Sequence, residues 1–185
     1  MRARRSGESA LLLLDAVAVL TTHGIDYAVI GAMAASVHGV VRASVDADAV
    51  LSLTIRELGE LEETFRAAGF QTELRRGDPD DPIPAMLVLS DSLGNRVDLL
   101  AGLRGLEAAA FSRAIEVPFQ DAALKIVGRE DFIAMKLFAG GPQDMADARH
   151  AFAIGRESLD TDLLRRLAAR YGREAARALD GLLAS

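Results

Sequence analysis

The chain has 185 residues, of which 50% are hydrophobic and 26% are charged, so it can bury a core as an ordinary globular domain. The absence of Cys excludes a disulfide framework, a thiolate zinc site and a Cys nucleophile. A formal net charge of −6 argues against a protein that coats nucleic acids, because such a protein needs a basic surface.

At the N-terminus, basic residues precede an apolar run, as they do in export signals. Asp15 interrupts this run, and no small-residue cleavage site closes it. No apolar stretch in the sequence approaches the ~20 residues that a membrane-spanning helix needs. We therefore predict a cytoplasmic protein with no membrane partner.

The first part of the sequence alternates between helices and strands. Leu and Val recur at helical spacing after Ser9, and Gly24 lies just past the last turn, where a glycine typically ends a helix. Thr54 and Glu57 have the spacing of a capping box at the start of another helix. In chain order, we predict helices over residues 9–22, 32–38 and 54–68, and strands over residues 25–30, 44–53 and 70–74.

The second part begins with a loop over residues 77–84 that is rich in Pro and Asp. Two strands, over residues 86–89 and 96–100, follow and are joined by a hairpin-type turn. Next come a short helix from about residue 103 and a strand over residues 115–119. From residue 129 onward the periodicity is helical throughout, and the predicted helices cover residues 131–138, 143–154, 159–170 and 173–183.

This order of elements predicts an α+β fold, because strands and helices are mixed at first and only helices follow. We expect a mixed sheet of about five strands, flanked by helices, with a C-terminal helical bundle. The domain boundary is placed near residue 125. Residues 1–125 would form the α/β core with its N-terminal helix, and residues 126–185 a helical part packed on that core, within one compact domain or as a separate unit.

Three acidic residues lie inside otherwise apolar strand patterns. Asp46 and Asp48 alternate with apolar residues and so share one face of their strand, while Asp98 lies between Val97 and Leu99 on another strand. Asp is disfavoured in strands, and a buried carboxylate is costly unless it is paired or binds a metal. If the two strands are neighbours in the sheet, all three carboxylates can meet.

Three carboxylates without His or Cys suit Mg²⁺ or Mn²⁺ rather than zinc. Such a cluster is what two-metal phosphoryl or nucleotidyl transfer requires. The alternative is an edge strand whose acidic face is simply solvated. Gly31 favours the functional interpretation, because it ends a strand 15 residues before Asp46 at a place where the backbone can approach a ligand.

Residues 27–48 resemble the signature of the nucleotidyltransferase superfamily with the polymerase-beta-type fold. In that signature an apolar residue and Gly, here Ile30 and Gly31, are followed after roughly ten residues by two acids with one residue between them, here Asp46 and Asp48. Small bacterial members of the AbiEii/AbiGii abortive-infection toxin type often have an Arg before the acids, and Arg42 occupies this place.

The C-terminal part is similar to a helical motif of the same family. In that motif a helical Lys precedes a turn, and two acids then open the next helix. Lys136 matches the Lys, and Asp144 and Asp147 match the acids. Two positions depart from the family pattern: Ala32 replaces the second small residue after the strand, and Gln143 replaces a basic residue. These departures leave room for an altered substrate or an inactive member.

The resemblance implies a role for each matched residue. Asp46, Asp48 and Asp98 would be both catalytic and metal-binding, with Asp98 as the general base on the acceptor hydroxyl. The nucleotide would be bound by residues of both motifs, namely Gly31, Ala32, Arg42, Lys136 and Asp144. Each of these also has a structural interpretation, such as a surface salt bridge for Arg42 or a Lys136 stem lying along an apolar surface.

The resemblance also implies an activity. The enzyme would use Mg²⁺ or Mn²⁺ to move an NMP from an NTP donor to a hydroxyl acceptor, with release of pyrophosphate. The acceptor would be a tRNA end, a protein side chain or a small molecule. The alternative is a catalytically degenerate binding module with a cognate toxin or antitoxin as its partner. A phosphohydrolase that uses the same acids fits Gly31 and Lys136 less well.

Overall fold

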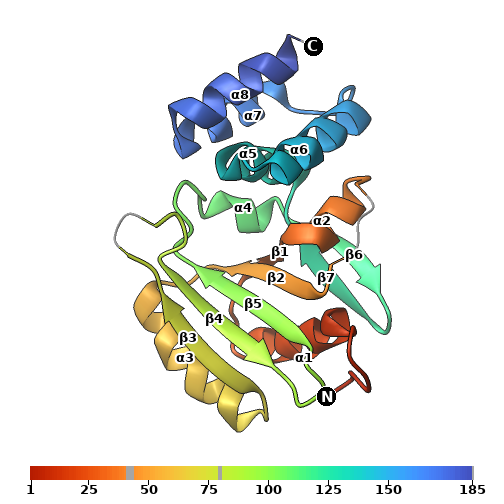
Figure 1. Ribbon diagram of the computed structural model, residues 1–185, viewed down its shortest axis with the longest axis vertical. Helices are drawn as coiled ribbons and strands as arrows, with labels where there is room; N and C mark the ends of the chain where they lie inside the picture. Colours follow the sequence, from red (N-terminus) through yellow and green to blue (C-terminus); the bar gives the residue numbers. More distant parts are fainter. Residues whose placement is uncertain (41–43, 79–80, 185) are drawn as a thin grey trace.

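The computed structural model describes residues 1–40, 44–78 and 81–184 of the chain. Its centre is a seven-stranded mixed sheet with the strand order β3-β4-β5-β2-β1-β7-β6 (Figure 1). The strands are β1 (Tyr27–Val29), β2 (Asp46–Leu51), β3 (Gln71–Arg76), β4 (Ala85–Ser90), β5 (Arg96–Ala101), β6 (Ile115–Phe119) and β7 (Ala122–Ile126). β2 is antiparallel to β1 and parallel to β5, which places the two acidic strands side by side.

Two helices cover one face of this sheet. The helix α1 (Ser9–Thr22) packs on β2 and β5, and α3 (Ile55–Ala67) packs on β3 and β4. In β2 and β5 the residues that face α1 are the buried ones, such as Ala47, Ala49 and Leu99. The acids occupy the alternate positions, so the side-chain alternation of a strand turns them to the opposite face.

The remaining helices lie between the sheet and the C-terminal end of the molecule or form that end (Figure 1). They are α2 (Gly31–Val37), α4 (Ala109–Ser112), α5 (Arg129–Ala139), α6 (Pro142–Gly155), α7 (Thr161–Tyr171) and α8 (Arg173–Leu183). The helix α5 packs against α6, α7 and α8, so it forms the centre of the C-terminal bundle. No helix among the described residues is long and apolar enough to cross a membrane.

The predicted fold class is confirmed: the sheet is mixed, helices flank it and a helical bundle follows. The capping box of Thr54 and Glu57 is also present at the start of α3. The prediction of about five strands was wrong, because the sheet has seven. Six of them correspond to predicted strand segments, and β7 was not predicted. The hairpin between β6 and β7 turns at Gln120, which adopts a positive φ of 55° without being a glycine, so the sequence carries no glycine signal there.

Candidate active site

The parallel pairing of β2 with β5 brings the acidic residues together. Asp48 is the register partner of Asp98, and Asp46 is the partner of Arg96. All four side chains therefore project from the same face of the sheet, which α1 and α3 leave uncovered. Asp46 and Asp48 are partly exposed, and Asp98 is 9% exposed. We refer to Asp46, Asp48, Arg96 and Asp98 as the strand-acid site.

Among the four residues of the strand-acid site, Arg96 is the cation. Its guanidinium binds the carboxylate of Asp98 through two hydrogen bonds. Its Nε donates to Oδ1 and its Nη2 to Oδ2 of Asp98, each at 2.8 Å. This hydrogen-bonded ion pair raises the pKa of Arg96, and the negative charge of Asp46 adds to the effect. The sequence prediction did not include Arg96, although its position two residues before Asp98 places it on the same face of β5.

Gly31 lies directly against the strand-acid site. The backbone N–H of the preceding residue, Ile30, donates to the carbonyl of Asp48 at 2.9 Å, which fixes the end of β1 beside β2. Gly31 has a φ of +63°, and a Cβ atom at this position would overlap the carboxylate of Asp48. Only glycine adopts this φ without strain and also lacks the Cβ atom that would collide with Asp48. The glycine of the predicted motif is therefore required by the structure at this position.

Next to Gly31 a cavity of about 190 Å³ separates the sheet from α5. Its walls are largely apolar and include Leu100, Phe132 and Phe138. Two of its lining residues are charged: Lys136 and Asp144, whose side chains form an ion pair at 2.6 Å. The structure therefore brings three of the predicted nucleotide-binding residues, Gly31, Lys136 and Asp144, to one cavity.

Lys136 is held by more than one partner. Its Nζ lies 3.2 Å from Oδ2 of Asp147 as well as beside Asp144, and 5.7 Å from the centre of the Phe132 ring. Its side chain is only 12% exposed. Gln143 donates to Oδ1 of Asp147 at 2.8 Å, so the residue that departs from the family pattern binds the second acid of the motif.

The two other predicted nucleotide-binding residues lie elsewhere. Ala32 lines a separate cavity of about 300 Å³, which it shares with Ser9, Ser36 and Asp46. Ala32 therefore lies beside the strand-acid site but not beside Lys136. Arg42 lies outside the described residues.

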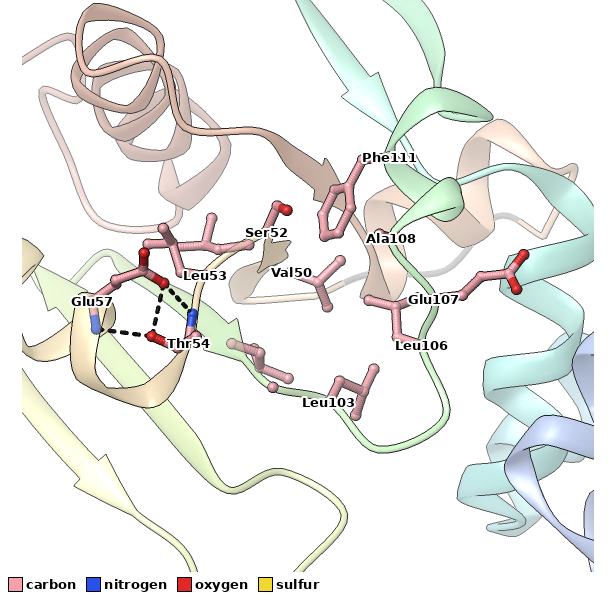
Figure 2. A pocket seen from close by; sticks show the side chains of 13 residues that line it. Val50, Ser52, Leu53, Thr54, Glu57, Leu103, Leu106, Glu107, Ala108 and Phe111 are labelled. Carbon is pink, nitrogen blue, oxygen red and sulfur yellow. Dashed lines mark hydrogen bonds between the residues drawn. The ribbon is translucent and has the colours of Figure 1, made fainter.

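A further pocket, of about 300 Å³, lies where β2 and β5 end (Figure 2). Val50 and Leu100, which occupy the same face as the acids, are part of its wall. Figure 2 shows Phe111 from α4 pointing toward Val50, whereas Glu107 points away from the pocket toward the C-terminal helices. On the open face of the sheet, the carboxylates are thus followed by apolar residues that line this pocket.

The strand-acid site has the right donor atoms for a hard divalent cation, because carboxylate oxygens are what Mg²⁺ and Mn²⁺ prefer. Asp46 and Asp48 fit this role as partly exposed carboxylates on one face. Asp98 meets Arg96 instead. Within the part of the chain that the structure describes, no group of three or more His, Asp or Glu side chains is arranged to hold a metal ion.

No protein-family model matches the sequence, and no curated protein is significantly similar to it. Solved structures do match the fold. The solution structure of the antibiotic-resistance factor ANT(2'')-Ia superposes with a TM-score of 0.59 at 14% identity, over 95% of this chain and 97% of that chain. The fold is that of the nucleotidyltransferases.

Two more structures agree with this result. The crystal structure of ANT(2'')-Ia in complex with adenylyl-2''-tobramycin matches with a TM-score of 0.56 at 15% identity, over 87% of this chain and 95% of that chain. The lincomycin-bound lincosamide antibiotic adenylyltransferase LnuA matches with a TM-score of 0.50 at 13% identity, over 82% of this chain and 99% of that chain. The nucleotidyltransferase fold therefore extends over the sheet and the C-terminal helices alike.

Proposed function

We propose that the protein is a metal-dependent nucleotidyltransferase that moves an NMP from an NTP to a hydroxyl acceptor and releases pyrophosphate. The observation that carries the proposal is the parallel register of β2 and β5, which sets Asp48 beside Asp98 with Asp46 on the same open face. The nucleotidyltransferase fold supports it, and so does the apolar cavity that begins at Gly31.

In the proposed reaction the acceptor oxygen attacks the α-phosphorus of the NTP. The bond from that phosphorus to the bridging oxygen breaks, and pyrophosphate leaves with the electron pair. Asp98 would take the proton of the acceptor hydroxyl as general base, which requires that Arg96 release at least one carboxylate oxygen. A divalent cation held by Asp46 and Asp48, with Asp98 as a third ligand, would supply charge neutralisation at the phosphates.

We place the nucleotide in the cavity between the sheet and α5. Its apolar walls suit the face of a nucleobase, and Gly31 lets phosphates lie close to the backbone beside Asp48. Lys136 and Asp144 at the same cavity would orient the sugar or the phosphates. Ala32 remains a proposed contact to the phosphates from the cavity on the other side of the strand-acid site. Arg42, which lies outside the described residues, also stays a proposed phosphate contact.

The acceptor is proposed only by class: a tRNA end, a protein side chain or a small molecule. Among the superposed structures, one of ANT(2'')-Ia contains adenylyl-2''-tobramycin, and LnuA is bound to lincomycin. The resemblance to the AbiEii/AbiGii toxin type leaves all three acceptor classes open. Incubation with labelled NTPs and each acceptor class distinguishes them by which product carries the label.

The test of the donor site is thermal unfolding with each of the four NTPs, with and without Mg²⁺. A ligand at roughly 100 times its Kd should raise the Tm by about 5–10 °C for a domain of this size. The shift should require Mg²⁺ and should be lost in the Asp46→Ala/Asp48→Ala double variant. The control is Asp162→Ala, whose side chain is 96% exposed in α7, far along the chain from the sheet.

A second candidate function is a catalytically inactive binding module in a toxin–antitoxin or defence pair. Specific observations favour it: Asp98 is neutralised by Arg96, Lys136 is held by two acids, and Ala32 replaces a family residue. Such a module folds without a metal. A Tm that does not change with any NTP and Mg²⁺, in a protein that unfolds cooperatively, would support this candidate and exclude the enzyme.

A further inference from the structure

The strand-acid site contains a cation of its own at the place where a metal ligand is expected. Arg96 and Asp98 are two residues apart on β5 and form two parallel hydrogen bonds of 2.8 Å. The Asp98 side chain is 12% exposed, so water competes little for its oxygens. A bidentate guanidinium–carboxylate pair occupies both carboxylate oxygens in the plane in which a cation would also bind.

We propose that Arg96 is a positioning residue that competes with the divalent cation for Asp98. This inference rests on the proposed function, because it concerns the metal of the same site. While Arg96 holds Asp98, both oxygens of this carboxylate are withheld from the cation, and a free cation binds weakly. When Arg96 moves away, the third carboxylate joins them and the cation binds more tightly.

The Arg96 guanidinium can also interact with partners other than Asp98. Its side chain is 33% exposed and lies on the open face of the sheet. Asp46, its register partner on β2, attracts the same guanidinium. A guanidinium also matches the geometry of a phosphate, so the triphosphate of a bound nucleotide would compete for it. The site would then bind a divalent cation tightly only when the nucleotide is bound, and weakly when it is absent.

The same sheet face provides a matched control. Arg75 and Glu73 on β3 are also two residues apart and also form a two-armed pair, at 2.8 Å for both hydrogen bonds. Register partners connect β3 to β4 and β4 to β5, so Arg75 lies on the same face but two strands away from Arg96. Arg75→Gln removes the same charge from the same kind of pair without freeing Asp98.

The test measures Mn²⁺ affinity of the full chain without nucleotide, from the EPR signal of the free ion. Arg96→Gln should bind Mn²⁺ about tenfold more tightly than the wild type, as expected when one charge-assisted competitor is removed. Arg75→Gln should change the Mn²⁺ affinity much less than Arg96→Gln, because Arg75 interacts with Asp98 through its charge alone and does not hold the carboxylate oxygens. Arg96→Lys, which keeps the charge but loses the two-armed geometry, should lie between them. Circular dichroism melting confirms that each variant is folded.

A double-mutant cycle isolates the role of Asp98. In the Asp98→Asn background, Arg96→Gln should increase the Mn²⁺ affinity much less than in the wild type, because the carboxylate that it frees is gone and only its electrostatic effect on Asp46 remains. If Asp46→Asn weakens Mn²⁺ binding but Arg96→Gln leaves the affinity unchanged, the metal site exists and the competition proposed for Arg96 is wrong. If neither the wild type nor Arg96→Gln binds Mn²⁺, the proposed metal site is wrong, and the competition fails with it.

Discussion

Two groups of charged residues lie in different parts of the same fold, and they differ in charge balance. The strand-acid site sets three carboxylates against one guanidinium on an open sheet face. The second group, here called the Arg113 cluster, has three cations for two acids and consists of Glu107, Asp131, Arg113, Arg166 and Arg170. In it, Arg113 binds Asp131 through two hydrogen bonds of 2.8 and 2.7 Å and Glu107 at 2.8 Å.

The Arg113 cluster has a structural role. Arg113 follows α4, Asp131 lies in the first turn of α5, and Arg166 reaches Glu107 from α7 at 2.7 Å. The Arg113 cluster thereby ties the segment after β5 to the C-terminal helices, while Figure 2 shows Glu107 directed away from the nearby pocket. The strand-acid site, with its excess of negative charge, is instead suited to receive a cation. We expect from this difference that the strand-acid site serves the proposed function and that the Arg113 cluster serves stability.

The largest effect should come from removing acids of the strand-acid site. Asp46→Asn or Asp48→Asn should lower the rate of nucleotidyl transfer roughly 10³-fold, because the charge that stabilises the transition state is lost. The free energy of unfolding should change by less than about 1 kcal/mol, since both side chains are partly exposed. Labelled-NTP transfer and urea unfolding measure the two quantities. A variant with full activity would contradict the assignment of that residue.

Asp131 should show the reverse pattern. Asp131→Asn leaves Arg113 partly buried beside a neutral amide, and breaking such a pair costs about 3 kcal/mol of unfolding free energy. The affinity of the strand-acid site for Mn²⁺ should not change. Urea unfolding and Mn²⁺ titration on the same sample give both values. A loss of Mn²⁺ affinity in a folded Asp131→Asn protein would show that the two groups are not separate.

Gly31 leaves room for the Asp48 carboxylate of the strand-acid site, and Gly24 provides a matched control. Both have nearly the same backbone conformation, with φ of +63° and +65°, but a Cβ at Gly24 meets no atom within 4 Å. Gly24→Ala should therefore cost only the backbone strain, about 1–2 kcal/mol. Gly31→Ala should cost more and should also weaken Mn²⁺ binding, because the new methyl group displaces the Asp48 carboxylate. Equal effects in the two variants would rule out that contact.

Much of the fold is readable from the sequence because its signals are local. Strand alternation placed Asp46 and Asp48 on one face, and capping chemistry placed the start of α3 at Thr54. The β6–β7 hairpin was not readable, since Gln120 adopts its positive φ only in the context of the folded sheet. Local patterns likewise predict that strands exist but not their order, which depends on packing.

The candidate site was readable in part for the same reason. The motif residues Gly31, Lys136 and Asp144 line one cavity, as a shared role requires. Their roles and those of the three acids remain predictions. Arg96 was not anticipated, because an Arg two residues from an Asp on a strand is ordinary in sequence. It matters only once the register shows that Asp98 stands beside Asp48.

The smallest predicted effect is the pH dependence of the Arg113 cluster. The hydrogen bond from Arg166, followed by contacts from Arg113, lowers the pKa of Glu107 from 4.5 to about 2. A lowered pKa in the folded state means that Glu107 stabilises the protein fully above pH 4.5. This contribution is then lost as the pH falls from about 4.5 to about 2. Because Arg166 is half exposed, we expect the contribution at pH 7 to be about 1 kcal/mol.

Glu107→Gln tests this in urea unfolding at pH 7, 5 and 3. The variant should be less stable than the wild type at pH 7 and pH 5, and the difference should shrink at pH 3, where the carboxyl of the unfolded wild type is protonated. Glu60→Gln is the control, because Glu60 pairs with Arg56 on the surface of α3 and both side chains are well exposed. It should change stability little at any pH. A stability difference for Glu107→Gln that stays constant from pH 7 to pH 3 would mean that the charge of Glu107 does not hold the helices to the core.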